Sequence, residues 1–274
     1  MPRSLREQGS PPLLHVVGGR LQYEIRAMSF GEILDTGLRI IRNHFVLLVG
    51  ISAVVNVPLT LLQSFLPQQL APGATEATTG IAVGFGLVSL LVVSPFVQVA
   101  ITFVIGEFYQ GRQTTPGHAF REALRIILPL LGTSLLAGLL MLLGTLLLVI
   151  PGIWVILGLA LLSPVMILER RFGSHAIRRS LDLMKGNRLR AFGIFCLTGI
   201  LTGVLAFTFG LAAAVFPFAG AIASGLATSV GAAFGIAVVV VLYFEIRCRK
   251  EAFEIEHLAR IVQASAGPTP QPIS

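Results

Sequence analysis

Two long runs without a charged residue constrain the fold more than any other feature of this sequence. Ile126–Leu168 contains 43 consecutive residues without Asp, Glu, Lys or Arg, and Ala191–Phe244 contains 54. A helix that crosses a membrane needs about 20 apolar residues, so each run has the length of two spans. The polar segment between them, Glu169–Arg190, carries seven of the chain's 20 Lys and Arg. This contrast argues against a soluble domain and predicts an all-α integral membrane protein.

Proline and glycine divide the apolar segments into six predicted spans. A single helix over the first run would be about 65 Å long, so Pro151-Gly152 is interpreted as a tight turn within it. Pro217–Gly220 divides the second run in the same way. The predicted spans are residues 44–66, 81–106, 126–150, 153–168, 191–216 and 221–244. Residues 29–261 form the predicted membrane domain, and residues 1–28 and 262–274 are predicted flexible tails without a signal peptide.

The distribution of positive charge predicts the orientation. All 20 Lys and Arg fall in the segments before span one, after span two, between spans four and five, and after span six. The three opposite loops contain none. Cytoplasmic loops are enriched in Lys and Arg, so both termini are predicted to be cytoplasmic in a multi-pass plasma-membrane protein. The net charge of +7 lies beside the spans, which predicts contact with anionic lipids and not with nucleic acid.

Three short segments that precede spans one, three and five align without gaps. They are Gly31–Arg42, Gly117–Leu128 and Ser174–Lys185. Each has an apolar and a charged face, as in helices that lie in the membrane interface. The small residues Gly37, Ala123 and Ser180 coincide, as do the leucines that follow them. We therefore interpret the chain as three parallel repeats of an interfacial helix and a two-span hairpin; the alternative is that all such interfacial helices look alike.

Local signals predict the ends of these helices and the packing of the spans. Ser29 with Glu32 forms a potential capping box, Thr115-Pro116 and Ser174 mark two further helix starts, and Gly186 marks a helix end. Trp154 is predicted to lie at the membrane interface beside the Pro151-Gly152 turn. Three GxxxG pairs are expected to pack spans within the chain and not to form a dimer face: Gly80/Gly84, Gly199/Gly203 and Gly231/Gly235.

Two sets of residues are candidates for binding. None of the predicted spans contains Asp, Glu, Lys or Arg, which weakens an ion- or proton-coupled mechanism and leaves Asn56 and Gln98 as candidate polar contacts within the membrane. The second set is a candidate site for anionic lipid headgroups, with a purely topogenic role as the alternative: Arg178, Arg179, Lys185, Arg188, Arg190, Arg247 and Arg249. Neither histidine spacing nor any catalytic motif indicates a metal, a cofactor or an enzyme.

Three fragments together resemble a known family. They are Leu148–Trp154, the segment Glu169–Gly186, and Tyr243–Glu256. In order and spacing they are similar to the glycerophosphoryl diester phosphodiesterase membrane-domain family of bacterial membrane proteins, over about residues 29–260. The family form of the third fragment is closer to Tyr-Tyr-Asp-Leu-Arg-x-Arg, from which Phe244 and Glu245 depart. The family takes its name from members that resemble a fused phosphodiesterase, whose catalytic domain is a TIM barrel of roughly 250 residues. This chain has no room for such a domain, so the resemblance implies a standalone membrane domain with no catalytic residues.

Two functions fit these observations. The first is a non-enzymatic role in lipid or membrane organisation, or as a scaffold for a membrane partner or a second copy of the chain. The second is a channel or transporter for a small or lipidic substrate. A polar cavity that reaches the middle of the membrane favours the second, whereas a glycine-packed bundle without a cavity favours the first.

Overall fold

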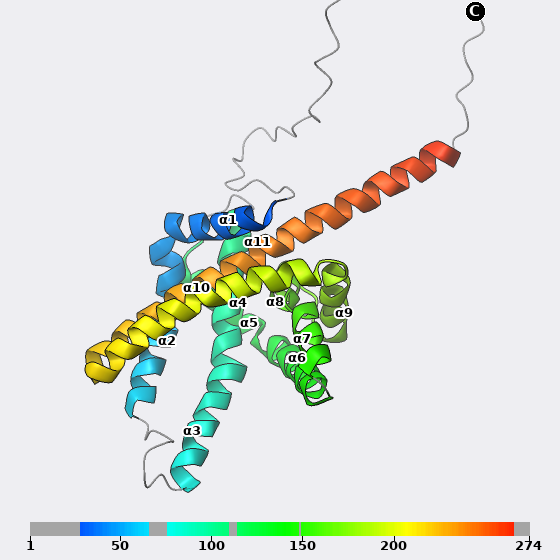
Figure 1. Ribbon diagram of the computed structural model, residues 1–274. Helices are drawn as coiled ribbons and strands as arrows, with labels where there is room; N and C mark the ends of the chain where they lie inside the picture. The colour runs from blue at the N-terminus through cyan, green and yellow to red at the C-terminus, as the bar shows by residue number, and fades with distance from the viewer. Residues whose placement is uncertain (1–27, 66–75, 110–113, 148, 266–274) are drawn as a thin grey trace, which may run out of the picture.

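The computed structural model describes residues 28–65, 76–109, 114–147 and 149–265, and all regular structure within these ranges is helical (Figure 1). The predicted tails of residues 1–27 and 266–274, and the predicted loop of residues 66–75, lie outside the described residues. The C-terminal tail was predicted to begin at residue 262, which is four residues before the end of the last helix is passed. Helix α11 continues through residues 262–265 to Ser265.

Among the described residues, five helical segments are long and apolar enough to cross a membrane: Phe45–Gln63, Ile127–Leu146, Pro151–Leu168, Arg188–Leu211 and Phe218–Lys250. They belong to α2 (Phe45–Phe65), α6 (Ile127–Leu147), α7 with α8 (Val149–Gly158 and Leu162–Leu168), α10 (Arg188–Val215) and α11 (Pro217–Ser265). The predicted span 81–106 falls on α3 (Glu76–Val88), a π-helical turn η1 (Ser89–Val93) and α4 (Ser94–Tyr109), which follow one another directly. The described part of the chain is thus all-helical, with several helices that are long and apolar enough to span a membrane.

The turn predicted at Pro151-Gly152 is wrong by a few residues. Both residues lie in the first turn of α7, which begins at Val149, whereas α6 ends at Leu147. Proline is tolerated in the first turn because its missing N–H would have no intrahelical acceptor there. Gly152 is needed for a different reason: a Cβ on it would lie 2.7 Å from the Cα of Thr145, so glycine lets α6 and α7 approach closely.

Three shorter helices begin near the predicted positions. They are α1 (Phe30–Asn43), α5 (Pro116–Arg125) and α9 (Gly173–Met184). The capping box of α1 is present, since the N–H of Ser29 donates to the Glu32 carboxylate at 2.6 Å and the N–H of Glu32 to the Ser29 hydroxyl at 3.4 Å. Pro116 is the first residue of α5, as predicted.

The start predicted for α9 is wrong, whereas its end is confirmed. The helix begins at Gly173, and its N-cap is Phe172 instead of Ser174. The cap comes from another helix, because the N–H of Gly173 donates to Oγ1 of Thr133 in α6 at 2.8 Å. Gly186 follows the end of α9 with φ +87°, a left-handed conformation that favours glycine.

The three short helices turn equivalent residues inward. Ile33, Ala119 and Ala176 occupy the same aligned position, and each is 0% exposed. Four residues later, Gly37, Ala123 and Ser180 are also buried. The leucines that follow the first two of these small residues, Leu38 and Leu124, are 57% and 59% exposed. The alignment made from the sequence therefore matches a shared inward face.

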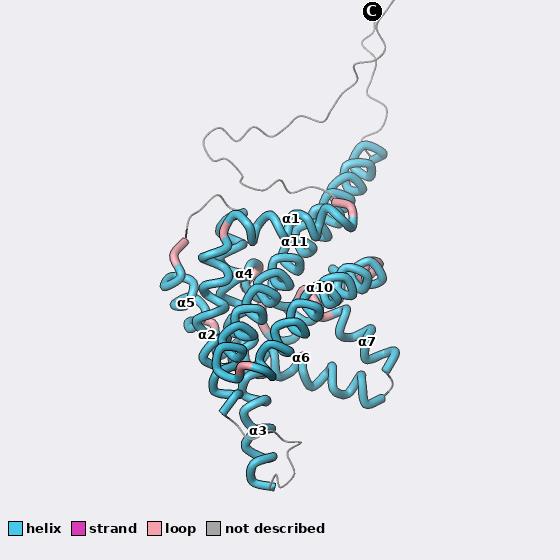
Figure 2. The backbone as a smooth tube through the Cα atoms, turned by 60° about the vertical axis from the view of Figure 1, so that its left-hand side comes forward, coloured by secondary structure: helices cyan, strands magenta, loops and turns pink. Residues whose placement is uncertain are grey.

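The longer helices form an inner and an outer group (Figures 1 and 2). The inner helices α4, α8 and α11 contact one another in all three pairs. The outer segments are far less buried: 22%, 17% and 11% of the apolar windows on α2, α6 and α10 are buried, against 56% for Pro151–Leu168 and for Phe218–Lys250. Each short helix contacts the inner group: α1 packs on α11, α5 packs on α4, and α9 packs on both α8 and α11.

Close backbone packing does not use the GxxxG pairs, so that prediction is wrong. A Cβ added at Gly80, Gly84, Gly199, Gly203 or Gly235 would meet no described atom within 4 Å, and only Gly231 of the six faces a neighbour, Thr202 at 3.4 Å. The tight approaches come from isolated glycines. Gly37 packs against Val238, and a Cβ on Gly225 would lie 3.0 Å from the Cα of Val57 in α2.

Candidate functional site

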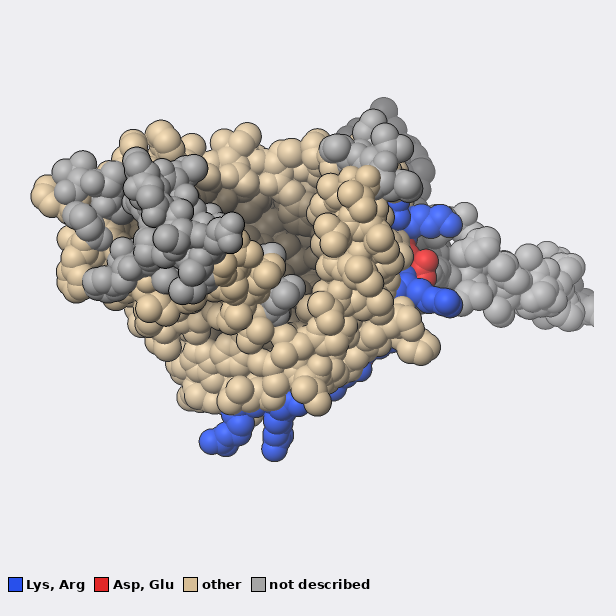
Figure 3. Space-filling view, turned by 90° about the horizontal axis from the view of Figure 1, so that it is seen from below, with Lys and Arg blue, Asp and Glu red and all other residues tan. Residues whose placement is uncertain are grey.

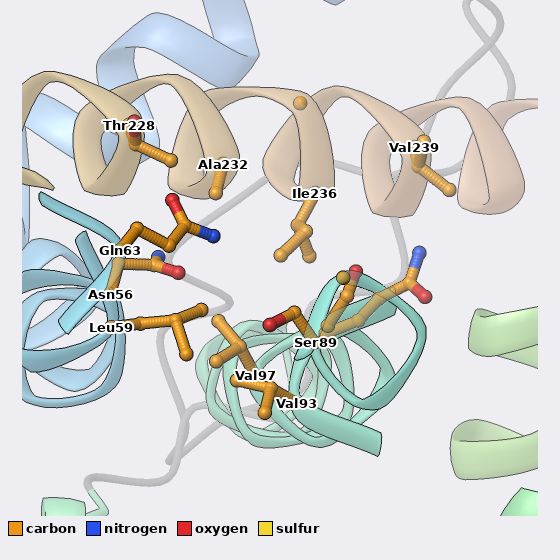
Figure 4. A pocket seen from close by; sticks show the side chains of 14 residues that line it. Asn56, Leu59, Gln63, Ser89, Val93, Val97, Thr228, Ala232, Ile236 and Val239 are labelled. Atoms are coloured by element: carbon orange, nitrogen blue, oxygen red, sulfur yellow. The ribbon is translucent and has the colours of Figure 1, made fainter. Parts of the chain in front are cut away.

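A cavity of about 550 Å³ lies between α2, the α3–η1–α4 segment and α11 (Figure 4). Its lining combines apolar side chains with amides and hydroxyls from three separate parts of the chain. The polar residues in the lining are Asn56, Gln63, Ser89, Ser94, Gln98 and Thr228. The two intramembrane residues singled out from the sequence, Asn56 and Gln98, therefore line the same cavity. Nothing in their sequence positions showed that they would meet.

Both amides lie at the same distance from one end of their helices, Asn56 about halfway along α2 and Gln98 in the second turn of α4. Asn56 comes eleven residues after the start of α2 at Phe45, and Gln98 comes eleven residues before the end of α4 at Tyr109. At 1.5 Å per residue, each lies about 17 Å from that helix end, close to half of a hydrocarbon core of about 30 Å. The face seen in Figure 3 is hollowed near its centre, and the described residues that border the hollow in this view are uncharged.

The lining has hydrogen-bonding capacity to offer a ligand. The side-chain amide of Asn56 donates to the Ser52 hydroxyl at 2.8 Å, and the Ser89 hydroxyl donates to the carbonyl of Phe85 at 2.8 Å. A primary amide has two donor hydrogens and an acceptor oxygen, so one bond leaves capacity on Asn56. Ser89 begins the π-helical turn, which precedes Pro95, and such turns are frequent at functional sites.

A second cluster, of buried charges, joins the ends of the inner helices. Glu245 of α11 has a fully buried side chain. Its Oε1 accepts hydrogen bonds from Arg190 Nη1 at 2.7 Å and from Arg249 Nη2 at 2.5 Å. Arg190 also donates to the backbone carbonyl of Met28. One carboxylate thus joins α10 to α11, and through Arg190 this pair also holds Met28, two residues before α1.

Glu169, which follows α8, has the same role for a second group of segments. Arg179 of α9 donates from Nε to both of its carboxylate oxygens at 3.1 Å. The Tyr243 hydroxyl of α11 donates to Glu169 at 3.0 Å, and Arg247 donates to that hydroxyl at 3.2 Å. A second carboxylate therefore joins the C-terminal end of α8 to α9 and α11. Tyr243, Glu245, Arg247 and Arg249 all come from the third fragment noted in the sequence.

These contacts separate the seven residues of the predicted headgroup site into four that bond other side chains of the protein and three that do not form an ion pair among the described residues. Arg179, Arg190 and Arg249 pair with carboxylates of the chain itself, and Arg247 bonds Tyr243. The sequence interpretation missed the two carboxylates that hold them. A signal was available, because Glu169 and Glu245 are each the first charged residue after a long uncharged run. A carboxylate at the end of an apolar run would be repelled by anionic lipid headgroups. Its position among many arginines therefore indicates ion pairs within the protein.

The other three cations of the predicted site are Arg178, Lys185 and Arg188. Within the part of the chain that the structure describes, none of them forms an ion pair. The Arg188 guanidinium lies 5.1 Å from the centre of the Trp154 ring. Trp154 was predicted to lie at the membrane interface beside the Pro151-Gly152 turn. In the structure its ring contacts Arg188, the first residue of α10. Trp154, Lys185 and Arg188 all line a groove of about 490 Å³.

The described residues contain no group of three or more His, Cys, Asp or Glu side chains able to hold a metal ion. Among the same residues, Cys196 and Cys248 are both free thiols. At one helix end, His44 stacks on Phe108 at 3.9 Å, and burial lowers the pKa of its imidazole. In comparisons with known proteins, no family model, no curated protein and no solved structure matches this chain.

Proposed function

We propose that the chain is a non-enzymatic plasma-membrane protein that binds or moves an uncharged, amphiphilic, lipid-like molecule in the cavity between α2, α4 and α11. The observation that carries the proposal is the meeting of Asn56 and Gln98 at half depth in one cavity with otherwise mostly apolar walls. Small-molecule sites occupy about 300 to 1,000 Å³ and combine apolar walls with a few polar groups. A hydroxyl, ester or amide could bond the two side chains while hydrocarbon fills the rest.

The cavity favours lipid handling over a purely structural scaffold. A scaffold needs only a packed bundle, and it gains nothing from polar side chains that face an open space inside it. The described residues of the lining include none that is charged, which disfavours a site for an ion and favours an uncharged ligand. Lipid organisation and transport of a lipidic substrate share this binding step.

We also propose that the α3–η1–α4 segment is a sixth span and that both termini are cytoplasmic. Support comes from the placement of every Lys and Arg on one set of loops. Under this proposal α1, α5 and α9 lie in the cytoplasmic interface and begin three repeated units. Helix α5 packs on α4, and α9 packs on α8, so each of these two helices contacts the last helix of the preceding unit. Helix α1 packs on α11, the last helix of the final unit, as expected for three repeats closed into a ring.

The orientation predicts the outcome of reporter fusions. A reporter enzyme that is active only outside the cytoplasm should be active when fused after Glu76 and silent when fused after Gly173, because these positions lie on opposite sides of the membrane. A reporter active only in the cytoplasm should give the reverse pattern at the same two sites. Activity after Gly173 with the first reporter would contradict the proposed orientation.

Cavity binding can be measured with a photoactivatable, clickable diacylglycerol in nanodiscs that contain the full chain. Replacing both amides, Asn56→Leu with Gln98→Leu, should weaken labelling about thirtyfold, since two lost hydrogen bonds at about 1 kcal/mol each amount to about 2 kcal/mol. Gly235→Phe should block labelling by filling the cavity from α11, because a Cβ at this lining position meets no described atom within 4 Å.

Two matched controls lie on α10, away from the cavity. Thr208→Val removes an exposed hydroxyl that bonds only its own helix at Val204, and Gly199→Phe adds a ring at a glycine with an equally open environment. Both should label like the unmodified chain. Equal labelling of all four variants, or crosslinked peptides from outside α2, α3–α4 and α11, would contradict the proposal.

A further inference from the structure

We propose that the groove where α9 ends and α10 begins binds the phosphate group of an anionic membrane lipid. Trp154, Leu181, Asp182, Lys185, Gly186, Arg188 and Leu189 line it, and its volume is about 490 Å³. The groove lies apart from the cavity between α2, α4 and α11, with which it shares no residue. The inference therefore does not rest on the function proposed for that cavity.

Arg188 is held in a geometry that leaves its charge for a ligand. Its guanidinium lies over the Trp154 ring, 5.1 Å from the ring centre, and it pairs with no described carboxylate. Its Nε is buried and has no hydrogen-bond partner among the described residues. A flat guanidinium supported on an aromatic face keeps its in-plane N–H groups for bidentate bonds to phosphate. This contrasts with Arg190, two residues later, whose charge Glu245 already neutralises.

The backbone adds positive potential at the same place. Gly186, with φ +87°, turns the chain between the two helices. Arg188, Leu189 and Arg190 form the first turn of α10, whose N–H groups have no acceptor within the helix. The positive end of the helix dipole thus coincides with the side chains of Lys185 and Arg188. Asp182 also lines the groove and carries the opposite charge. Two cations and the positive end of a helix outweigh this one carboxylate, so the potential in the groove remains positive.

The apolar part of the lining identifies the source of the phosphate. Leu189 is 76% exposed, and Leu181 and the Trp154 ring lie on the same groove. A soluble phosphate ion gains nothing from such walls. A phospholipid places its phosphate beside hydrocarbon, and tryptophan favours that boundary between headgroups and acyl chains. The combination of cations with exposed apolar side chains therefore favours a membrane lipid.

Trp154 allows binding to be observed directly, because it is the only tryptophan in the chain. The full chain is placed in phosphatidylcholine nanodiscs with increasing fractions of phosphatidylglycerol, and Trp154 emission is recorded. Emission should change and saturate as the anionic lipid increases. Lys185→Gln should raise the half-saturating fraction about tenfold, as expected for a lost charge-assisted hydrogen bond, and Asp182→Asn should lower it.

Arg178→Gln is the matched control, since Arg178 is an exposed cation on the same helix and does not line the groove. It should leave the half-saturating fraction unchanged. Arg188→Gln also alters the environment of Trp154, so this variant is tested by native mass spectrometry of co-purified lipids, where it should lose bound phosphatidylglycerol. Trp154→Phe, which keeps an aromatic face, should retain more of that lipid than Trp154→Ala.

Three results would overturn the proposal. The first is a Trp154 emission that does not respond to phosphatidylglycerol. The second is an equal effect of Arg178→Gln and Lys185→Gln, which would reduce the groove to general surface charge. The third is a saturating response to sodium phosphate in pure phosphatidylcholine nanodiscs without any response to the anionic lipid, which would make the ligand a soluble phosphate.

Discussion

Replacing Arg190 with Gln is expected to destabilise the protein far more than replacing Arg249 with Gln, although both guanidinium groups bond the same oxygen of Glu245. The Glu245 side chain is 0% exposed, that of Arg190 is 21% exposed and that of Arg249 is 48% exposed. Loss of Arg190 leaves the buried Glu245 carboxylate with only the half-exposed Arg249 as its ion-pair partner among the described residues, so we expect a loss that approaches the cost of an unpaired buried charge, about 3 kcal/mol. Loss of the more exposed partner costs about 1 kcal/mol or less.

The comparison can be made by thermal or detergent unfolding of the purified chain. Arg39→Gln sets the baseline, because Arg39 pairs with Asp35 at the surface, where both side chains are more than half exposed. A double variant, Arg190→Met with Glu245→Leu, should recover much of the stability, since no buried charge is left unpaired. Equal losses for Arg190→Gln and Arg249→Gln would show that burial does not control the strength of these pairs.

Gly225→Val is expected to cause the second large loss, because it forces α11 away from α2. A Cβ at this position would lie 2.5 Å from Oγ1 of Thr60 and 3.0 Å from the Cα of Val57. Backbone cannot give way as a flexible side chain does, so we expect a cost of about 3 kcal/mol, the upper end for overpacked sites. The same step breaks the bond from the Thr60 hydroxyl to the carbonyl of Ala221, 3.1 Å in length.

Gly225→Val should also reduce binding in the cavity, since Val57 follows Asn56 on α2. Gly199→Val is the control: it makes the same change on α10, where a Cβ meets no described atom within 4 Å. Unfolding midpoints and diacylglycerol labelling should both fall for Gly225→Val and stay unchanged for Gly199→Val. If the two variants behave alike, α2 and α11 are not packed through Gly225.

Features that depend on local chemistry were predictable from the sequence. The capping box at Ser29 and the stop at Gly186 were placed correctly, because each is decided by a few neighbouring backbone and side-chain groups. The apolar helices were also found, since hydrocarbon leaves a spanning chain no alternative to internal hydrogen bonding. The error at Pro151 has a local cause as well: proline fits the first turn of a helix and a turn between helices equally well.

Features that depend on distant partners were not predictable. Ser174 looked like an N-cap, yet Thr133, 40 residues earlier, caps α9 at Gly173. The GxxxG pairs looked like packing sites, yet a glycine packs a helix only where a partner happens to lie opposite, as Val57 does for Gly225. Seven cations looked like one headgroup site, whereas Glu169 and Glu245 neutralise three of them.

The two uncharged runs on either side of Glu169–Arg190 thus determined by themselves that this chain forms several helices that are long and apolar enough to span a membrane. Hydropathy acts residue by residue, so it can be read along the chain. Only the tertiary structure decided which arginines are neutralised and which polar residues share a cavity. Coulomb and hydrogen-bond energies depend on the distance between groups, and the distance from Asn56 to Gln98, or from Arg190 to Glu245, exists only once the helices have packed.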